Sequence, residues 1–173
     1  MRYQDYLRDV PDFPKPGIVF KDITPLLAAP EAFAAACDEL AAAARGLAPT
    51  RIGAIESRGF LFGAPLAERL ALPLFPLRKP GKLPAATLAE SYDLEYGSAT
   101  LEVHTDAAGP GDRVLLVDDL LATGGTVAAA ASLVRRLGAE VAGAAFLIEL
   151  AFLGGRRRLD GLPVLRLVEI SGE

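Results

Sequence analysis

The segment from Val114 to Ala130, with the sequence VLLVDDLLATGGTVAAA, most constrains how this chain can fold. Its apolar run predicts a buried strand that ends in two acids, Asp118 and Asp119, and a short loop then leads into an amphipathic helix. In open α/β sheets, ligands bind beyond the carboxyl ends of the strands. We therefore expect the loop between this strand and this helix to form part of a binding site.

The loop includes the sequence TGGT, from Thr123 to Thr126, and these residue types are typical of a phosphate site. Glycines let backbone N–H groups approach a ligand closely, and a helix N-terminus offers unpaired N–H donors at the positive end of its dipole. Threonine hydroxyls add donors, whereas the two carboxylates suit hydroxyl groups, which donate to them. The loop therefore predicts a phosphate beside a diol, as in a ribose 5-phosphate. The alternative is a threonine-capped helix whose glycines serve only the turn.

The pattern of the whole chain predicts an α/β fold with a central, mainly parallel sheet flanked by helices. Apolar stripes at helical spacing predict helices over 31–45, 60–70 and 125–137. Continuously apolar runs, typical of parallel strands covered on both faces, predict strands over 52–55, 72–77, 114–117, 141–147 and 164–168.

Two segments differ from this core pattern. Residues 1–30 are rich in proline, which predicts an N-terminal arm or hood that lies outside the core. Residues 88–104 predict an antiparallel hairpin, with strands over 92–95 and 99–104, that forms a flap. We expect the arm, the flap and the sheet to form a single domain over residues 1–173.

Composition narrows the classes of function. The formal net charge of −4 argues against nucleic-acid binding as the main role. The single cysteine, Cys37, excludes an intrachain disulfide and indicates a reducing, cytoplasmic location. We find no secretory signal and no apolar run of about 18 residues, so we expect no membrane span. One histidine, His104, and one cysteine cannot build a zinc site; we expect no metal held by the protein alone, and His104 on an exposed strand face.

Basic side chains elsewhere in the chain suit an anionic ligand. Arg58 follows the predicted strand 52–55 and is a fork-shaped donor for phosphate, although a surface ion pair with Glu56 is the alternative. Arg78, Lys79 and Lys82 form a basic cluster that suits a diphosphate, whereas a solvated run of charges is the ordinary alternative.

Several motifs, taken together, resemble a known family. The segment 114–130 is similar to the phosphoribosyl pyrophosphate (PRPP) signature of type I phosphoribosyltransferases, which is specific for PRPP but not for the base. Five further stretches resemble adenine phosphoribosyltransferases in particular, and with 114–130 they cover nearly the whole chain in the family's order. They are 12–25 (DFPKPGIVFKDITP), 56–63 (ESRGFLFG), 78–84 (RKPGKLP), 94–97 (LEYG) and 146–150 (FLIEL).

The resemblance implies transfer of the phosphoribosyl group of PRPP to adenine, which gives AMP and pyrophosphate. The 5-phosphate would lie on Ala122, Thr123, Gly124, Gly125 and Thr126, and the ribose hydroxyls would face Asp118 and Asp119. Glu56, Ser57, Arg58, Arg78, Lys79 and Lys82 would surround the pyrophosphate, and the family's loop at 56–58 often contains a cis peptide. Mg²⁺ would arrive with the phosphates of PRPP, and Arg58 and Lys82 would help it to stabilise the leaving pyrophosphate.

The resemblance also places the base. Val19 and Lys21 would meet adenine through the main chain and Phe20 would stack on it, although Phe20 could instead anchor the arm. The family often has arginine at position 21, a change of little consequence if only the backbone reads the base. Glu95 would be the catalytic acid and base near N7, and Tyr96 would help to seal the pocket; the alternative for Glu95 is a solvated hairpin residue.

Two other functions remain open from the sequence. The phosphate loop alone also suits a phosphoribosyltransferase for a 6-oxopurine or for orotate. A non-catalytic, PRPP-sensing regulator of transcription is the alternative from another class, but the chain shows no helix-turn-helix extension and its net charge is negative. Neither nucleic acid nor a membrane is an expected partner, and the resemblance implies a homodimer.

Overall fold

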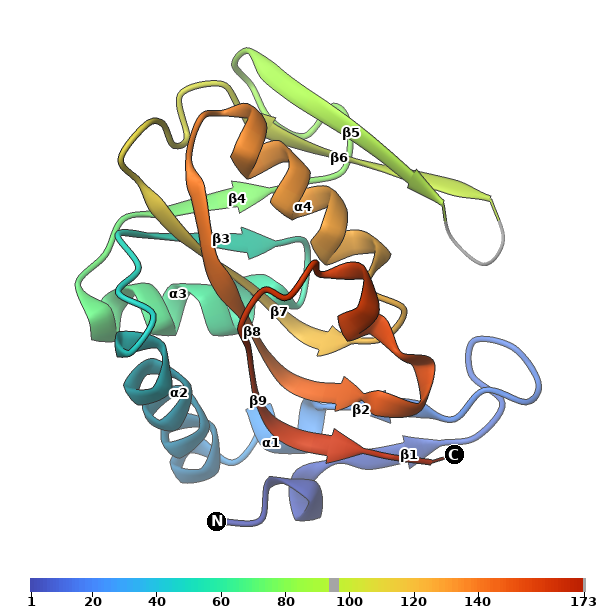
Figure 1. Cartoon of the computed structure of the whole chain (residues 1–173). Helices are drawn as coiled ribbons and strands as arrows, with labels where there is room; N and C mark the ends of the chain where they lie inside the picture. The colour runs from blue at the N-terminus through green and yellow to red at the C-terminus, as the bar shows by residue number, and fades with distance from the viewer. Residues whose placement is uncertain (94–96, 173) are drawn as a thin grey trace.

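The computed structural model describes residues 1–93 and 97–172, and a five-stranded sheet lies at its centre (Figure 1). The strands follow the order β4-β3-β7-β8-β9, and each neighbouring pair is parallel. Their bounds are β3 Arg51–Ile55, β4 Leu74–Leu77, β7 Arg113–Leu121, β8 Glu140–Leu150 and β9 Val164–Ile170. The predicted α/β fold with a central parallel sheet is confirmed.

Helices cover both faces of this sheet. Helices α2 (Pro30–Arg45) and α3 (Gly59–Leu70) pack on one face, and α4 (Gly125–Arg136) packs on the other (Figure 1). Alternate residues of β7 serve the two cores, with Leu115 on the α2 and α3 side and Leu116 on the α4 side. The three helices fall where the apolar stripes predict them.

A two-stranded antiparallel hairpin, β5 (Thr87–Asp93) and β6 (Ser98–His104), lies beside α4 (Figure 1). The predicted hairpin is confirmed, but its first strand begins at Thr87 rather than at residue 92, and the predicted residues 94–96 lie outside the described part. Arg136 at the end of α4 donates hydrogen bonds to the Ala89 carbonyl oxygen at 2.6 Å and to Glu90 Oε2 at 2.8 Å. The hairpin is therefore tied to the helix that follows the phosphate loop.

The N-terminal residues form short elements, namely η1 Tyr3–Tyr6, β1 Arg8–Val10, β2 Phe20–Asp22 and α1 Thr24–Leu27. Strands β1 and β2 pair in an antiparallel arrangement and carry an exposed loop between them. The prediction that all of 1–30 lies outside the core is wrong, because Tyr3, Ile23 and Leu26 are at most 4% exposed and belong to the core under α2. Proline and turn signals report local backbone shape and carry no information on burial.

Strand β7 is longer than the apolar run predicts. It continues through both acids to Leu121, because Asp118, Leu120 and Leu121 keep their pairing with β8. The phosphate loop is correspondingly short, from Ala122 to the first residue of α4. Turns η2 (Ala151–Leu153) and η3 (Gly155–Arg158) connect β8 to β9. Within 1–93 and 97–172, we find no helix with the length and apolar character that crossing a bilayer requires.

Candidate active site

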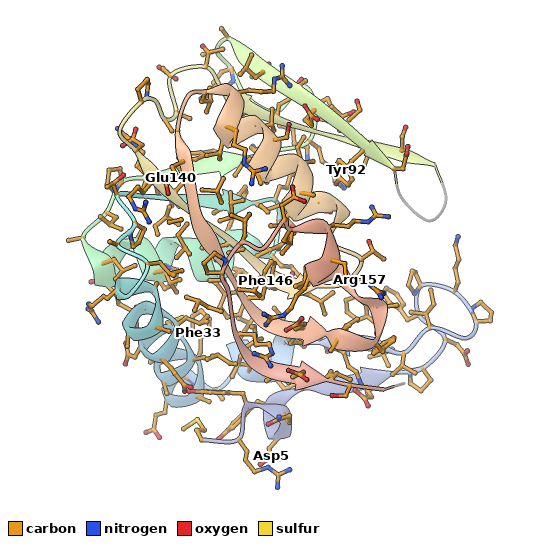
Figure 2. The ribbon with its side chains drawn as sticks, viewed as in Figure 1. Asp5, Phe33, Tyr92, Glu140, Phe146 and Arg157 are labelled. Carbon is orange, nitrogen blue, oxygen red and sulfur yellow. The ribbon has the colours of Figure 1, made fainter. Side chains whose placement is uncertain are left out.

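A cavity of about 650 Å³ lies at the carboxyl ends of β3 and β7, the edge at which the fold predicts a ligand. Its walls come from residues 56–58 after β3, from 118–127 between β7 and α4, from Lys79 and Pro80, from Tyr92 and 99–101 of the hairpin, and from Phe146 of β8. Figure 2 labels Tyr92 on the hairpin and Phe146 on the sheet. The cavity therefore joins the sheet, the helix α4 and the hairpin.

The phosphate loop forms one end of the cavity. Gly124 precedes α4 with a φ of 83°, a left-handed conformation that glycine adopts without a steric penalty. A Cβ at Gly124 would also collide with the carbonyl oxygen of Gly155 in η3. Because the first N–H groups of α4 have no partner within the helix, this end of the cavity offers backbone donors to an anion. Thr126 Oγ1 donates to the hydroxyl of Tyr92 at 3.2 Å, which links the loop to the hairpin.

The two acids stand beside this loop, in the last part of β7. Asp119 is 3% exposed and accepts a hydrogen bond from Arg58 Nε at 2.6 Å. Asp118 accepts from the backbone N–H of Asp119 at 2.9 Å. Burial, together with the neighbouring Asp119 carboxylate, raises the pKa of Asp118 well above its usual value. The cavity wall thus carries two adjacent carboxyl groups, whose oxygens can accept hydrogen bonds from donors such as sugar hydroxyls.

At the β3 end of the cavity, a cation cluster surrounds Glu56. Glu56 accepts from Lys82 Nζ at 2.6 Å, from Arg78 Nε at 3.2 Å and from the backbone N–H of Lys79 at 2.9 Å. Burial raises the pKa of Glu56, but the three donors outweigh it and hold the pKa below its usual value. The peptide bond between Glu56 and Ser57 is cis, as in the loop that the resemblance describes.

The alternative reading of Glu56 and Arg58 as an ion pair with each other is wrong. Glu56 pairs with Arg78 and Lys82, whereas Arg58 pairs with Asp119. The side chains after β3 point to different charged partners because those partners come from other strand ends, which sequence spacing does not reveal.

The arm reaches this site through Arg58. The Arg58 guanidinium lies 5.1 Å from the centre of the Phe20 ring, and Phe13 packs edge-on against Phe20 with ring centres 5.2 Å apart. Lys21 Nζ bonds Asp9 at 2.7 Å, and Val19 is exposed. Phe20 therefore lies next to a residue of the cavity wall, although the cavity lining itself does not include residues 19–21 among the described residues.

The structure thus brings most of the predicted site residues together. Glu56, Ser57, Arg58, Lys79, Asp118, Asp119 and 122–126 line one cavity, with Arg78 and Lys82 bonded to its wall. Glu95 and Tyr96 lie outside the described residues. Sequence reasoning missed Tyr92 and Phe146 as lining residues. In the sequence, Tyr92 lies between the polar residues Ser91 and Asp93, an alternation that indicates a half-buried strand. Phe146 lies in a uniformly apolar run, which does not distinguish it from its neighbours.

Neither His104 nor Cys37 belongs to this cavity. His104 is half-buried rather than exposed, and its Nε2 accepts a hydrogen bond from the backbone N–H of Ala85 at 3.3 Å. Cys37 is fully buried in α2, and burial raises the pKa of its thiol to about 11. In the described part of the chain, no group of three or more His, Cys, Asp or Glu residues is placed to hold a metal ion.

Comparison with known proteins defines the class of the chain. The model of the phosphoribosyl transferase domain matches residues 26–161, which include the cavity walls from Glu56 to Phe146. The chain is therefore a phosphoribosyltransferase by class.

Individual relatives identify the family within this class. The chain is 59% identical over 165 residues to an adenine phosphoribosyltransferase of Frankia casuarinae, which covers 95% of this chain and 88% of that protein. The crystal structure of adenine phosphoribosyltransferase from Thermoanaerobacter pseudethanolicus matches with a TM-score of 0.95 and 53% identity over 97% of this chain and 98% of that one. The Giardia lamblia enzyme, solved with 9-deazaadenine, matches with a TM-score of 0.92 and 35% identity over 98% and 97%. The chain belongs to the adenine phosphoribosyltransferase family.

Proposed function

We propose that this chain transfers the phosphoribosyl group of PRPP to adenine and releases AMP and pyrophosphate, as in purine salvage. The observation that carries the proposal is the juxtaposition, in one cavity, of the helix N-terminus at Gly124 and Gly125 with the carboxylates of Asp118 and Asp119. A phosphate and a diol on one ribose match that pair of surfaces. Membership of the family supports adenine as the base.

The phosphate loop holds the 5-phosphate of PRPP in this proposal. Backbone donors from Ala122 to Thr126 bind the phosphate oxygens, and the hydroxyls of Thr123 and Thr126 add to them. Asp118 and Asp119 accept the ribose hydroxyls and orient the sugar. As the bond to pyrophosphate lengthens, positive charge grows on the ribosyl centre, and the nearby carboxylates offset it.

The cation cluster binds the leaving group. Lys79 lines the cavity, whereas Arg78 and Lys82 donate hydrogen bonds to Glu56 in its wall. An incoming pyrophosphate group therefore competes with Glu56 for Arg78 and Lys82. Arg58 adds a fork donor between Asp119 and Phe20. Mg²⁺ would arrive on the oxygens of PRPP, a usual arrangement for this ion, and would supply positive charge that offsets the charge of the leaving pyrophosphate.

The arm and the flap close the remaining sides. Phe20 stacks on adenine while the backbone of Val19 and Lys21 reads its edge, and Phe20 lies next to Arg58 of the cavity wall. Glu95, outside the described residues, exchanges a proton with N7 of the base, and Tyr96 excludes water. On this proposal, Glu95→Ala lowers kcat far more than it raises the KM for PRPP, and a near-normal kcat removes the acid/base role.

The direct test is pyrophosphate release from PRPP and Mg²⁺ with adenine, hypoxanthine, guanine or orotate added in turn. We expect release with adenine and only background with the other three. Release with another base would keep the phosphate-loop assignment and overturn the role of Val19, Phe20, Lys21 and Glu95. Binding of PRPP without release for any base would instead favour a non-catalytic sensor.

The same proposal includes a single-domain homodimer in the cytoplasm. Closed, two-fold dimers are the commonest assembly of such proteins, and the exposed Leu61 of α3 and Leu74 of β4 offer apolar surface. A free, buried Cys37 suits a reducing compartment. Light scattering coupled to size exclusion tests the assembly, because a monomeric mass at micromolar concentration would exclude the dimer.

A further inference from the structure

A buried carboxylate outside the cavity is bound by two arginines. Glu149, near the end of β8, is 4% exposed, and Arg156 of η3 donates to its Oε1 from Nε at 2.5 Å and to its Oε2 from a terminal nitrogen at 2.8 Å. Arg166 of β9 lies 2.9 Å from the same Oε2. Both oxygens of a buried carboxylate are thus satisfied, which is the condition for tolerating its charge. The transfer reaction assigns no role to this cluster.

The strand register places this carboxylate beside the phosphate loop. Glu149 pairs with Leu121, the last residue of β7 before the loop begins at Ala122. Its bonded partner Arg156 directly follows Gly155, whose backbone lies against the loop. A Cβ at Gly155 would collide with the carbonyl oxygen of Ala122, and a Cβ at Gly124 would collide with the carbonyl oxygen of Gly155.

The phosphate loop is thus supported by η3 on the side of Gly155. The peptide units of Gly155 and of Ala122–Gly124 are in direct contact, so a shift of η3 moves the loop that carries the phosphate donors. The bidentate pair between Arg156 and Glu149 fixes η3 to the end of β8 with the geometry that an arginine fork provides. Arg156 is engaged with Glu149 through two nitrogens and therefore acts on the loop through Gly155 rather than on the phosphate.

We infer that Glu149 and Arg156 are positioning residues that hold the phosphate loop in its binding conformation through Gly155. This inference rests on the proposed function, because it assumes that the loop binds the 5-phosphate of PRPP. Binding of PRPP, rather than that of adenine, should depend on the pair. Arg166 provides a control, since it forms an ion pair with the same carboxylate, as well as with Glu169, from β9 rather than from η3.

The experiment compares Arg156→Gln with Arg166→Gln by PRPP titration with Mg²⁺, by steady-state kinetics and by thermal unfolding. We expect Arg156→Gln to raise the Kd and KM for PRPP about tenfold, because small displacements of binding groups are costly, with little change in the KM for adenine. Arg166→Gln should lower the melting temperature comparably, because it also leaves Glu149 short of a partner, but keep PRPP affinity near that of the wild type.

The outcomes separate the two proposals. A wild-type chain that fails to bind PRPP or to use adenine overturns the proposed function, whatever the variants do. A wild type that binds PRPP together with an Arg156→Gln variant of equal affinity overturns the positioning role, and so does an equal loss in Arg166→Gln. If Arg156→Gln does not fold, Arg156→Lys keeps the charge but loses the fork, and its KM for PRPP should still rise about threefold; an unchanged KM there overturns the inference.

Discussion

The two anion-binding ends of the cavity are built in different ways. At the α4 end, the donors are backbone N–H groups fixed by the helix, by a left-handed Gly124 and by the contact with Gly155. At the β3 end, the donors are the side chains of Arg78 and Lys82, which already hold the carboxylate of Glu56. The first end is ready for an anion before one arrives, whereas the second must exchange its internal counter-ion for the ligand. Binding the 5-phosphate should therefore depend on shape, and binding the pyrophosphate on charge.

The largest expected effect comes from the acids between the two ends. Asp118→Asn together with Asp119→Asn removes both carboxyl groups that the proposed function places at the ribose hydroxyls, and we expect kcat/KM for PRPP to fall at least about 1000-fold. Steady-state kinetics checks the fall. Asp160→Asn, an exposed aspartate with a positive φ that asparagine tolerates, serves as the control. Turnover close to wild type in the double variant would refute the ribose assignment.

Shape at the α4 end is tested by Gly124→Ala. The added Cβ meets the carbonyl oxygen of Gly155 and takes up a φ of 83°, so the loop must move, and we expect the KM for PRPP to rise about 100-fold. Gly161→Ala is the matched control, because it has a φ of 75° but no atom within 4 Å of the added Cβ. The control should lose only about 1 kcal/mol of stability and keep its KM. Equal KM values for the two variants would mean that the loop contact is irrelevant to binding.

Charge at the β3 end is tested by Glu56→Gln. The amide keeps the shape of the side chain but no longer competes with pyrophosphate for Lys82 and Arg78, so product inhibition by pyrophosphate should strengthen about three- to fivefold. The inhibition constant measures this directly. Glu68→Gln, an exposed residue of α3 that pairs with Arg69, should leave the constant unchanged. Weaker inhibition in Glu56→Gln would show that Glu56 helps to hold the anion instead of competing with it.

The smallest expected effect concerns stability. Because the pKa of Asp118 is raised in the folded chain, the unfolded chain releases this proton first, and the native state loses stability as pH rises from about 4 through the raised pKa. Asp118→Asn carries no charge at any pH, so it should melt a few degrees above the wild type at neutral pH and show no such loss. Melting curves from pH 4 to 8 test this. A variant that melts below the wild type at pH 7 would contradict the assigned direction of the pKa shift.

Much of the fold follows from the sequence because its signals are local. The stripe of Cys37, Leu40 and Ala44 predicts the buried face of α2, and TGGT predicts the helix N-terminus at the cavity. The burial of Tyr3 and Leu26 does not follow, since it depends on α2 covering them from elsewhere in the chain. The end of β7 is likewise set by pairing with β8 rather than by its own apolar run.

The site divides in the same way. The residues that line one loop, such as Asp118, Asp119 and Gly124, could be predicted from their order in the chain. The partners across the cavity could not, because Arg58 with Asp119 and Glu56 with Lys82 join segments that only the sheet order brings together. The positions of Phe146 in the cavity wall and of the Glu149–Arg156 pair beside the loop could not be predicted either. An apolar run and a surface arginine usually have purely structural roles, so neither stands out in the sequence.

The most direct measurement is a crystal structure of the chain with AMP and pyrophosphate bound. The account predicts the AMP phosphate on the N–H groups from Ala122 to Thr126, the ribose hydroxyls on Asp118 and Asp119, and Lys82 turned from Glu56 towards pyrophosphate. An AMP phosphate held by Arg78 and Lys82, with the Gly124 loop left without an anion, would contradict the account.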